Sequence, residues 1–291
     1  MKQVYLINPS AANAKKAFRF IRKNKYTHHN LLLVKNKTRM FTSYVQKGVT
    51  HFVICGGDGT INNVITEYMK LSKNIRSKMI FSLFPCGTAN DLSRELSKSF
   101  IRSKTRTMKI DLIKINQDYI LTGGGTGFIS EVVQSLESGT SKFIQNRVFK
   151  SMKYYFHALK KIIVGYDGSV IKSINGKPVN KKCMFVAFNN QITIGKHFHL
   201  SPHSSQDDGG FYICICEKGN SMLKGLDILK KVVRGTHITD ELVTYQKYKT
   251  AKIILNKKQQ IMGDGELLKP NQELSLQIIP KEVTFSQLRF E

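Results

Sequence analysis

The fold is decided by the stretch Phe52-Val53-Ile54-Cys55-Gly56-Gly57-Asp58-Gly59-Thr60-Ile61-Asn62-Asn63-Val64. Strand-favouring residues run into three glycines within four positions, and apolar residues then recur at helical spacing from Ile61 to Tyr68. This order predicts a strand, a glycine-rich turn and a helix. Glycine lets the backbone approach an anion closely, and the first N–H groups of a helix attract phosphate. The stretch therefore indicates a phosphate-binding turn.

A second segment repeats this pattern, Phe81-Ser82-Leu83-Phe84-Pro85-Cys86-Gly87-Thr88-Ala89-Asn90-Asp91-Leu92. A short apolar strand leads into a Pro/Gly turn, and Thr, Asn and Asp follow as capping residues before a helix. In open α/β sheets such turns lie at the carboxyl edge, where ligands bind. The pattern is neither a P-loop nor a dinucleotide fingerprint, because the chain lacks Gly-Lys-Ser/Thr and has Asn62 where a third glycine is needed.

Together, GGDGTINNV and FPCGTANDLSREL resemble the bacterial branch of the diacylglycerol kinase catalytic family, which also includes sphingosine and ceramide kinases. The resemblance runs nearly end to end. It implies an N-terminal Rossmann-like three-layer α/β nucleotide-binding domain and a C-terminal antiparallel β-sandwich-like domain, with the active site in the interdomain cleft. Strands that alternate with helices in the first third of the chain independently predict a mostly parallel sheet.

Composition is consistent with a folded two-domain chain. It has 291 residues, 41% of them hydrophobic, and a formal net charge of +26 that is spread along its length. Such a charge attracts any polyanion, whether nucleic acid, an anionic membrane or nucleotide phosphate. The five cysteines form no CxxC pair, which favours buried thiols in a reducing compartment. No signal peptide or long apolar run is visible.

The resemblance implies ATP as the phosphoryl donor, with Mg²⁺. It places the nucleotide on the turn after the first strand, on a threonine after the second strand, and on the two glycine-containing turns. The corresponding residues here are Asn8, Pro9, Ser10, Ala11, Ala12, Thr38, Gly57, Asp58, Gly59, Thr60, Ile61, Asn62, Asn63 and Thr88. Ala11 and Ala12 replace a common Ser-Gly pair, and Asn63 replaces a common Glu.

Asp58 is the acidic residue within the glycine-rich turn. A carboxylate among backbone donors suits the orientation of Mg²⁺ beside a polyphosphate, and as an Asx-turn former it equally suits a structural role. The resemblance favours the functional role.

The pattern changes after Arg94. Two short strands flank Asn116-Gln117, which predicts a hairpin and a switch to antiparallel pairing. We therefore expect residues 1–112 to form the ATP-binding domain, with residues 275–291 packing back on it, and residues 113–274 to form a β-rich lipid-substrate domain. Gly123–Gly127 is interpreted as a close-packing turn. In the family an Asp follows the next Phe, and here Ile129 takes its place.

The second domain is expected to be an all-β lobe apart from one helix, residues 147–164. That helix has an apolar face and many lysines, a pattern that suits either a core face or an anionic membrane surface. Asn175-Gly176 predicts a second hairpin.

An acidic turn before a predicted strand, Ser201-Pro202-His203-Ser204-Ser205-Gln206-Asp207-Asp208-Gly209-Gly210, resembles the family's Pro…Asp-Asp-Gly element. In Gram-positive members this element holds a structural Mg²⁺. The resemblance thus implies that Asp208 is the side-chain ligand and that Ser205 and Gly210 offer carbonyls. A plain Asp-Gly turn is the alternative.

Asp264-Gly265-Glu266 matches the family's catalytic signature, in which the Glu is the proposed general base. In an extended chain, residues two apart point to the same side, which would let Asp264 and Glu266 converge. Asp-Gly-Glu is also common in ordinary turns, and that alternative stays open. The catalytic candidates are therefore Glu266, Asp264 and Asp58.

The resulting prediction is a lipid kinase that transfers the γ-phosphoryl group of ATP to a diacylglycerol-like hydroxyl. It is expected to be cytoplasmic, to associate transiently with the inner face of the membrane, to find anionic phospholipids as partners and to bind no nucleic acid. The resemblance allows a homodimer. Two alternatives stay open, namely a kinase of a soluble acceptor such as NAD and a non-catalytic, basic membrane- or nucleic-acid-binding protein.

Overall fold

The computed structural model describes residues 3–30, 36–87, 90–138, 147–195 and 197–288. The chain divides into two compact units, one formed by Met1–Ile110 with Lys281–Glu291 and the other by Asp111–Pro280. The sequence prediction placed these boundaries after residue 112 and before residue 275. Strands β5 (Thr107–Ile115) and β13 (Glu266–Ser286) each contribute residues to both units.

The N-terminal unit is built on a parallel sheet with the strand order β2-β1-β3-β4, and the end of β13 pairs with β4 in parallel at Phe285 and Phe81. In the sequence, its strands are mostly continuous apolar runs, because both faces of the sheet are covered and buried. Their bounds are Gln3–Ile7 (β1), His28–Asn30 (β2), His51–Gly56 (β3) and Ile80–Pro85 (β4). The apolar run at residues 31–34 also predicts a buried strand, but these residues lie outside the described ones.

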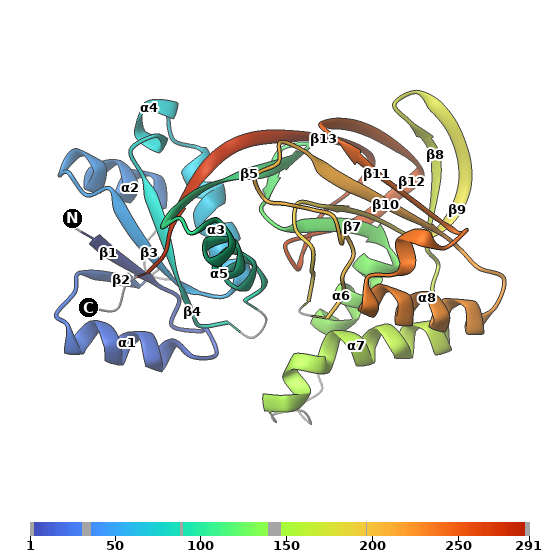
Figure 1. Cartoon of the computed structure of the whole chain (residues 1–291), viewed down its shortest axis with the longest axis horizontal. Coiled ribbons are helices and arrows are strands. Elements are labelled where there is room, and N and C mark those ends of the chain that lie inside the picture. The colour runs from blue at the N-terminus through green and yellow to red at the C-terminus, as the bar shows by residue number, and fades with distance from the viewer. Residues whose placement is uncertain (1–2, 31–35, 88–89, 139–146, 196, 289–291) are drawn as a thin grey trace. The chain divides into compact units, whose positions relative to one another are not determined.

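Helices cover both faces of this sheet (Figure 1). On one face, Ala17 and Ile21 of α1 pack against Tyr5 and Val53. On the other face, Phe41 of α2 meets Phe52 with 5.2 Å between ring centroids. This is the predicted three-layer α/β fold. The helices are Ala14–Lys23 (α1), Lys37–Gln46 (α2), Asp58–Met69 (α3), Lys73–Arg76 (α4) and Asp91–Ser103 (α5).

The C-terminal unit contains an antiparallel sheet with the strand order β11-β10-β9-β7-β12-β13, and β8 pairs with both β9 and β12. This agrees with the predicted sandwich-like domain. The strands are Asp118–Ile120 (β6), Gly123–Gly127 (β7), Ser169–Ile174 (β8), Lys177–Asn189 (β9), Phe211–Glu217 (β10), Val243–Tyr248 (β11) and Thr250–Gly263 (β12).

Two hairpins form where the sequence predicts them. Ile115 pairs with Asp118 around Asn116-Gln117, and Ile174 pairs with Lys177 around Asn175-Gly176. Asn175 and Gly176 have φ values of 51° and 78°, as a two-residue hairpin turn with two left-handed residues requires.

Successive side chains of a strand point to opposite faces of the sheet, so the strands contribute to two hydrophobic cores in this unit. In β10, Ile213 and Ile215 join one core, whereas Cys214 and Cys216 join the other. The second core is covered by helices α6 (Phe128–Ser138), α7 (Arg147–Val164) and α8 (Met222–Arg234), which lie along one face of the sheet (Figure 1). The expected helix α7 is present. The expectation that the rest of this unit is all-β is wrong, because two further helices, α6 and α8, bury the second apolar face of the sheet.

The glycine run Gly123–Gly127 is the central strand β7, between β9 and β12, and not a turn. A Cβ atom on Gly124 would lie 2.2 Å from the carbonyl oxygen of Met262, and one on Gly125 would lie 2.6 Å from that of Val186. The run is therefore a close-packing element, as predicted, and its glycines allow the neighbouring backbones to approach.

All five cysteines are buried and free, which confirms the prediction of buried thiols. Burial raises the pKa of Cys183 and Cys216 to about 12. These thiols are therefore poor nucleophiles near neutral pH.

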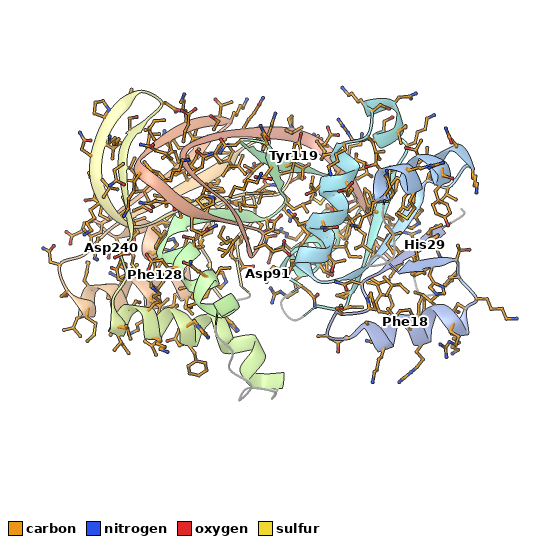
Figure 2. The ribbon with its side chains drawn as sticks, turned by 180° about the vertical axis from the view of Figure 1, so that it is seen from behind. Phe18, His29, Asp91, Tyr119, Phe128 and Asp240 are labelled. Atoms are coloured by element: carbon orange, nitrogen blue, oxygen red, sulfur yellow. The ribbon has the colours of Figure 1, made fainter. Side chains whose placement is uncertain are left out.

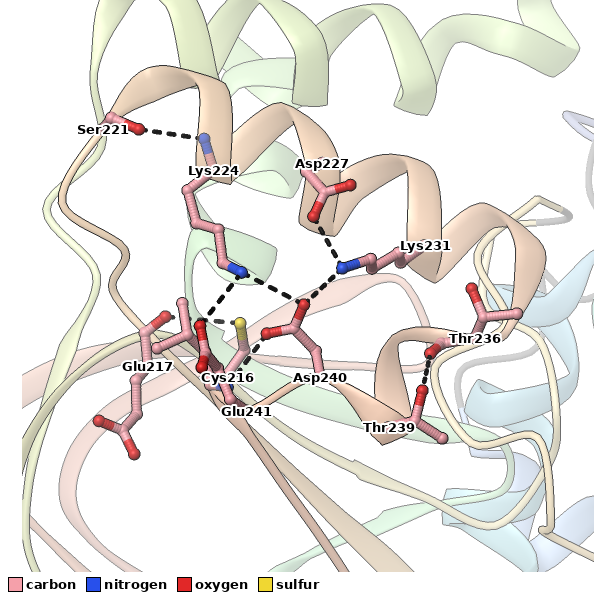
Figure 3. A network of polar contacts seen from close by, with 11 residues as sticks. Cys216, Glu217, Ser221, Lys224, Asp227, Lys231, Thr236, Thr239, Asp240 and Glu241 are labelled. Atoms are coloured by element: carbon pink, nitrogen blue, oxygen red, sulfur yellow. Dashed lines mark hydrogen bonds and ion pairs between the residues drawn. The ribbon is translucent and has the colours of Figure 1, made fainter.

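Asp240 ties helix α8 to the short helix η1 (His237–Thr239), as Figure 3 shows. Its Oδ2 atom lies 2.6 Å from Lys231 Nζ and 3.4 Å from Lys224 Nζ, and its side chain is only 2% exposed. Burial raises the pKa of Asp240, but hydrogen bonds from Lys231 and from the N–H of Leu242 outweigh burial, so the pKa is lowered overall.

We expect Asp240→Asn to lower the free energy of unfolding by about 1–3 kcal/mol in urea denaturation, because it removes the charge that Lys231 binds. Asp227→Asn is the matched control. Asp227 also contacts Lys231, at 2.8 Å, but is 43% exposed, so the loss should stay below about 0.5 kcal/mol. Because the folded-state pKa of Asp240 is lowered, the stabilisation should be complete above about pH 4 and fade as pH falls through that pKa. Equal losses in both variants would contradict this account.

Candidate active site

Three turns meet at the carboxyl ends of β1, β3 and β4. The side-chain amide of Asn8, after β1, donates to the hydroxyl of Thr60 at 2.9 Å. The N–H of Asn13 donates to the carbonyl of Cys86, after β4, at 2.9 Å. Since the strands are parallel, their turns share one edge of the sheet, which is where open α/β folds bind ligands.

Gly57 and Gly87 bring the second and third turns into backbone contact. A Cβ atom on Gly57 would lie 2.9 Å from Gly87 Cα, and one on Gly87 would lie 2.4 Å from Gly57 Cα. The side chain of Asn90 holds the third turn, because it accepts from the N–H of Gly87 and donates to its carbonyl, both at 2.9 Å. Any larger residue at either glycine would separate the turns. Thr88 lies outside the described residues.

The carboxylate of Asp58 caps helix α5. Its two oxygens accept the N–H groups of Asp91 and Leu92, at 3.0 and 3.1 Å. The Ncap residue itself, Asn90, makes no side-chain cap and has φ of 52°. Asp58 thus satisfies the first amides of a helix that follows it by 33 residues. Its proposed role toward Mg²⁺ stays a prediction.

The sequence predicts Asp91 as a capping residue of helix α5, but not its pairing with Arg94. Asp91 begins α5 (Figure 2), and its Oδ1 atom forms an ion pair with Arg94 Nη2. The side chain of Asp91 is only 8% exposed, and its own N–H binds Asp58. The spacing of three residues between an acid and an arginine at a helix start was the available signal.

The other residues expected at the nucleotide lie in different surroundings. In the first turn, the N–H of Ser10 donates to Asn8 Oδ1 at 3.0 Å. The hydroxyl of Thr38, on α2, donates to Glu67 of α3 at 3.0 Å. The side chain of Ile61 is in the core, with 2% exposed. Positions that are half-buried or exposed, and so accessible to a ligand, are Pro9, Ser10, Ala11, Ala12, Gly57, Gly59, Thr60, Asn62 and Asn63.

The Asp-Gly-Glu segment is a hairpin turn between β12 and β13. Asp264 and Gly265 have φ of 50° and 84°, and Gly263 pairs with Glu266 across the hairpin. The expectation of an extended segment is therefore wrong, and the argument that Asp264 and Glu266 point to the same side fails. Asp264 is 7% exposed, whereas Glu266 is exposed.

Asp264 holds this hairpin against the start of β7. Its carboxylate accepts the N–H of Leu121 at 2.9 Å, and both the N–H and the hydroxyl of Thr122, at 2.8 and 2.5 Å. The N–H of Gly123 adds a longer contact of 3.4 Å. A buried carboxylate with this many donors fixes the position of the neighbouring Glu266.

The acidic turn does not fit the implied Mg²⁺ site. Asp208 Oδ2 lies 2.8 Å from Lys247 Nζ, and Asp208 Oδ1 accepts the N–H of Gly210 at 3.2 Å. The hydroxyl of Ser205 donates to Asp207 at 2.7 Å. Mg²⁺ requires octahedral oxygen ligands, whereas the Asp208 carboxylate here binds the Lys247 ammonium and the N–H of Gly210.

A glycine-turn α/β unit joined to a β-sandwich-like unit defines a class of kinases, and two family models match this chain accordingly. The diacylglycerol kinase catalytic domain matches residues 3–113, and the YegS C-terminal NAD kinase beta sandwich-like domain matches residues 133–286. The chain therefore belongs to the diacylglycerol kinase catalytic-domain family of lipid kinases.

Several similar proteins come from Bacillus and Staphylococcus species. The chain is 24% identical to a diacylglycerol kinase of Bacillus subtilis, over 74% of this chain and 70% of that protein. It is also 24% identical to a diacylglycerol kinase of Staphylococcus carnosus, over 76% and 72%. A crystal structure of a putative diacylglycerol kinase from Bacillus anthracis has the same fold, with a TM-score of 0.72 at 20% identity, covering 98% of this chain and 94% of that one.

We expect Asp264→Asn to lower the free energy of unfolding by about 2–4 kcal/mol, because an amide nitrogen would face backbone N–H donors that now bind a carboxylate. Glu266→Gln, two residues away and exposed, should change it by less than about 0.5 kcal/mol. Urea denaturation of both variants tests the contrast. If Asp264→Asn unfolds like the wild type, the carboxylate does not hold the hairpin.

Proposed function

We propose that this chain is an ATP-dependent lipid kinase, which transfers the γ-phosphoryl group of ATP to the hydroxyl of a diacylglycerol-like lipid. The observation that carries the proposal is the assembly of the three turns, through the contact of Asn8 with Thr60 and the backbone contact of Gly57 with Gly87. Membership in a family of lipid kinases supports it.

In this proposal, the phosphates of ATP bind at the start of helix α3, on Gly57, Gly59 and Thr60. The first N–H groups of a helix have no intrahelical acceptors, and the helix dipole favours an anion there. Asn8 keeps the hydroxyl of Thr60 in place at 2.9 Å. Mg²⁺ bound with the nucleotide would neutralise part of the phosphate charge. Asp58 lies between Gly57 and Gly59, so its carboxylate is the candidate in this turn to orient the metal ion.

Glu266 is proposed as the general base. Its backbone is fixed by the hairpin that Asp264 anchors, and its side chain is exposed at the start of β13. The hydroxyl oxygen of the acceptor attacks the γ-phosphorus, the bond from that phosphorus to the bridging oxygen of ADP breaks, and Glu266 takes the hydroxyl proton. The barrier is lowered mainly by positioning and charge neutralisation.

Label transfer tests the proposal. ATP labelled at the γ-phosphate is offered with Mg²⁺, a panel of lipids in mixed micelles, and NAD as a soluble acceptor. We expect organic-extractable label in a diacylglycerol-like lipid. Glu266→Gln should lower kcat at least ~100-fold, the usual scale for loss of a general base, with ATP affinity kept. Its near-wild-type stability, predicted above, makes it a clean variant.

Two results would overturn parts of the proposal. Label found only in NAD would keep the phosphate-binding turns and reject the lipid acceptor. Near-wild-type turnover by Glu266→Gln would remove that residue from the role of base.

An exposed apolar end on helices α7 and α8 suits a membrane surface, where the lipid acceptor resides. Val164 is 75% exposed and Leu223 is 72% exposed. These helix ends are neighbours, because a Cβ atom on Gly225 of α8 would lie 3.3 Å from Ile162 of α7. Figure 1 shows the two helices side by side. Within the described residues, no helix is long and apolar enough to cross a bilayer.

Lysines lie on the same two helices. Lys160 on α7 and Lys230 on α8 are exposed, whereas Lys161 and Lys224 are paired with Glu131 and Asp240. With a net charge of +26 on the whole chain, the surface is complementary to anionic phospholipid. We therefore include in the proposal that this end of the C-terminal unit docks on an anionic membrane.

Vesicle binding tests the docking surface. We expect Val164→Asp and Leu223→Asp each to weaken binding to anionic vesicles at least ~10-fold, since each removes one inserted apolar side chain. Ile101→Asp is the matched control, because Ile101 is 76% exposed on α5 of the other unit, and its binding should be unchanged. Binding should also weaken with salt. Equal losses in all three variants would reject this surface.

A further inference from the structure

The acidic turn Ser205–Gly210 is held by its own polar groups and by one carboxylate from β5. Asp111 Oδ2 accepts the N–H of Gly209 at 2.7 Å, and Gly209 has φ of 72°. Ser205 donates to Asp207 at 2.7 Å, and Gly210 donates to Asp208 at 3.2 Å. The two carboxylates of the turn and that of Asp111 therefore lie near a short length of backbone, where a cation offsets their negative charge.

Lys247 of β11 supplies a cation to this turn. Its Nζ atom lies 2.8 Å from Asp208 Oδ2 and 3.4 Å from the backbone carbonyl oxygen of the same residue. One ammonium group therefore binds both a carboxylate oxygen and a main-chain carbonyl oxygen. These are the two kinds of ligand that a hard divalent cation takes from a turn.

The sheet positions the aliphatic part of the Lys247 side chain beside the acidic turn. Lys247 pairs directly with Tyr212 between β11 and β10, and its Nζ atom lies 5.9 Å from the centroid of that ring. A Cβ atom on Gly210 would lie 2.5 Å from Lys247 Cε. Because Gly210 has no side chain, the Lys247 side chain can pass beside it and reach Asp208.

A Mg²⁺ ion at this turn and the Lys247 ammonium would compete for the carboxylate of Asp208. Two like charges on one carboxylate oxygen repel each other strongly, and Mg²⁺ also demands near-octahedral geometry at short distances. The side chains of Asp208 and Lys247 are 26% and 40% exposed, so water screens the pair partly. Both oxygens of the carboxylate are already engaged, since Lys247 binds Oδ2 and the N–H of Gly210 donates to Oδ1.

We propose that Lys247 takes the place of a metal ion in this chain, and that the acidic turn Ser205–Gly210 is a metal-free turn with a built-in ammonium. The Mg²⁺ set implied by the resemblance, Asp208 with carbonyls of Ser205 and Gly210, is replaced by the pair Asp208–Lys247. Any divalent metal that the chain requires then enters with the nucleotide. The inference concerns the C-terminal unit alone and does not rest on the proposed function.

Mn²⁺ binding to the full-length, nucleotide-free chain tests the proposal, with the free ion followed by electron paramagnetic resonance. Wild type and Asp208→Asn should bind Mn²⁺ alike. Lys247→Met keeps most of the stem and removes the charge, so it should gain a site that binds Mn²⁺ at least ~10-fold more tightly than the double variant Lys247→Met/Asp208→Asn. Lys247→Gln should gain the same site, which provides a second variant.

Thermal unfolding in EDTA supplies a readout independent of metal binding. Lys247→Met should unfold at a lower temperature than the wild type, and Mn²⁺ should restore part of the loss. Lys249→Met, at an exposed lysine two residues further on, should unfold as the wild type does. A wild-type Mn²⁺ site that Asp208→Asn abolishes would overturn the proposal, and so would a failure of Lys247→Met and Lys247→Gln to gain one.

Discussion

The backbones of Gly57 and Gly87 touch, and the arrangement of the N-terminal unit depends on this contact. A Cβ atom on either residue would lie within 3 Å of the other's Cα. The contact joins the turn after β3 to the turn after β4, and Asn8 joins the turn after β1 to the same group through Thr60. Three polar turns thus gather at one sheet edge, and the proposed nucleotide site follows from that gathering.

Three carboxylates of this chain, two buried and one half-buried, bind backbone N–H groups. Asp58 receives the first amides of α5, Asp264 receives those of Leu121 and Thr122, and Asp111 receives that of Gly209. Each carboxylate fixes a turn next to a candidate functional residue. The chain has only 20 acidic residues against 46 Lys and Arg, and several of these few acids are used to position the main chain. The basic surplus remains on the surface, where it suits phosphate and anionic lipid.

Two departures from the sequence-based expectations have different causes. Asp264-Gly265 is a two-residue turn with positive φ at both positions, which is a local property of an Asp-Gly pair rather than of an extended segment. The acidic turn differs from the implied metal site because Lys247, which is distant in the sequence, binds Asp208. Likewise, α6 and α8 were missed because the sheet face that they bury is formed only when β7, β9 and β10 come together.

The sequence by itself determined what depends on neighbouring residues. Apolar runs gave the parallel strands, Gly-rich segments gave the turns, Asn-Gly gave a hairpin, and the spacing from residue 147 to 164 gave helix α7. Tertiary structure alone decided which residues meet. Asp58 and Asp91 are 33 positions apart, Asp264 and Thr122 are 142 apart, and Lys247 and Asp208 are 39 apart. Local propensity acts over a few residues, whereas these contacts form only when packing closes the loops between them.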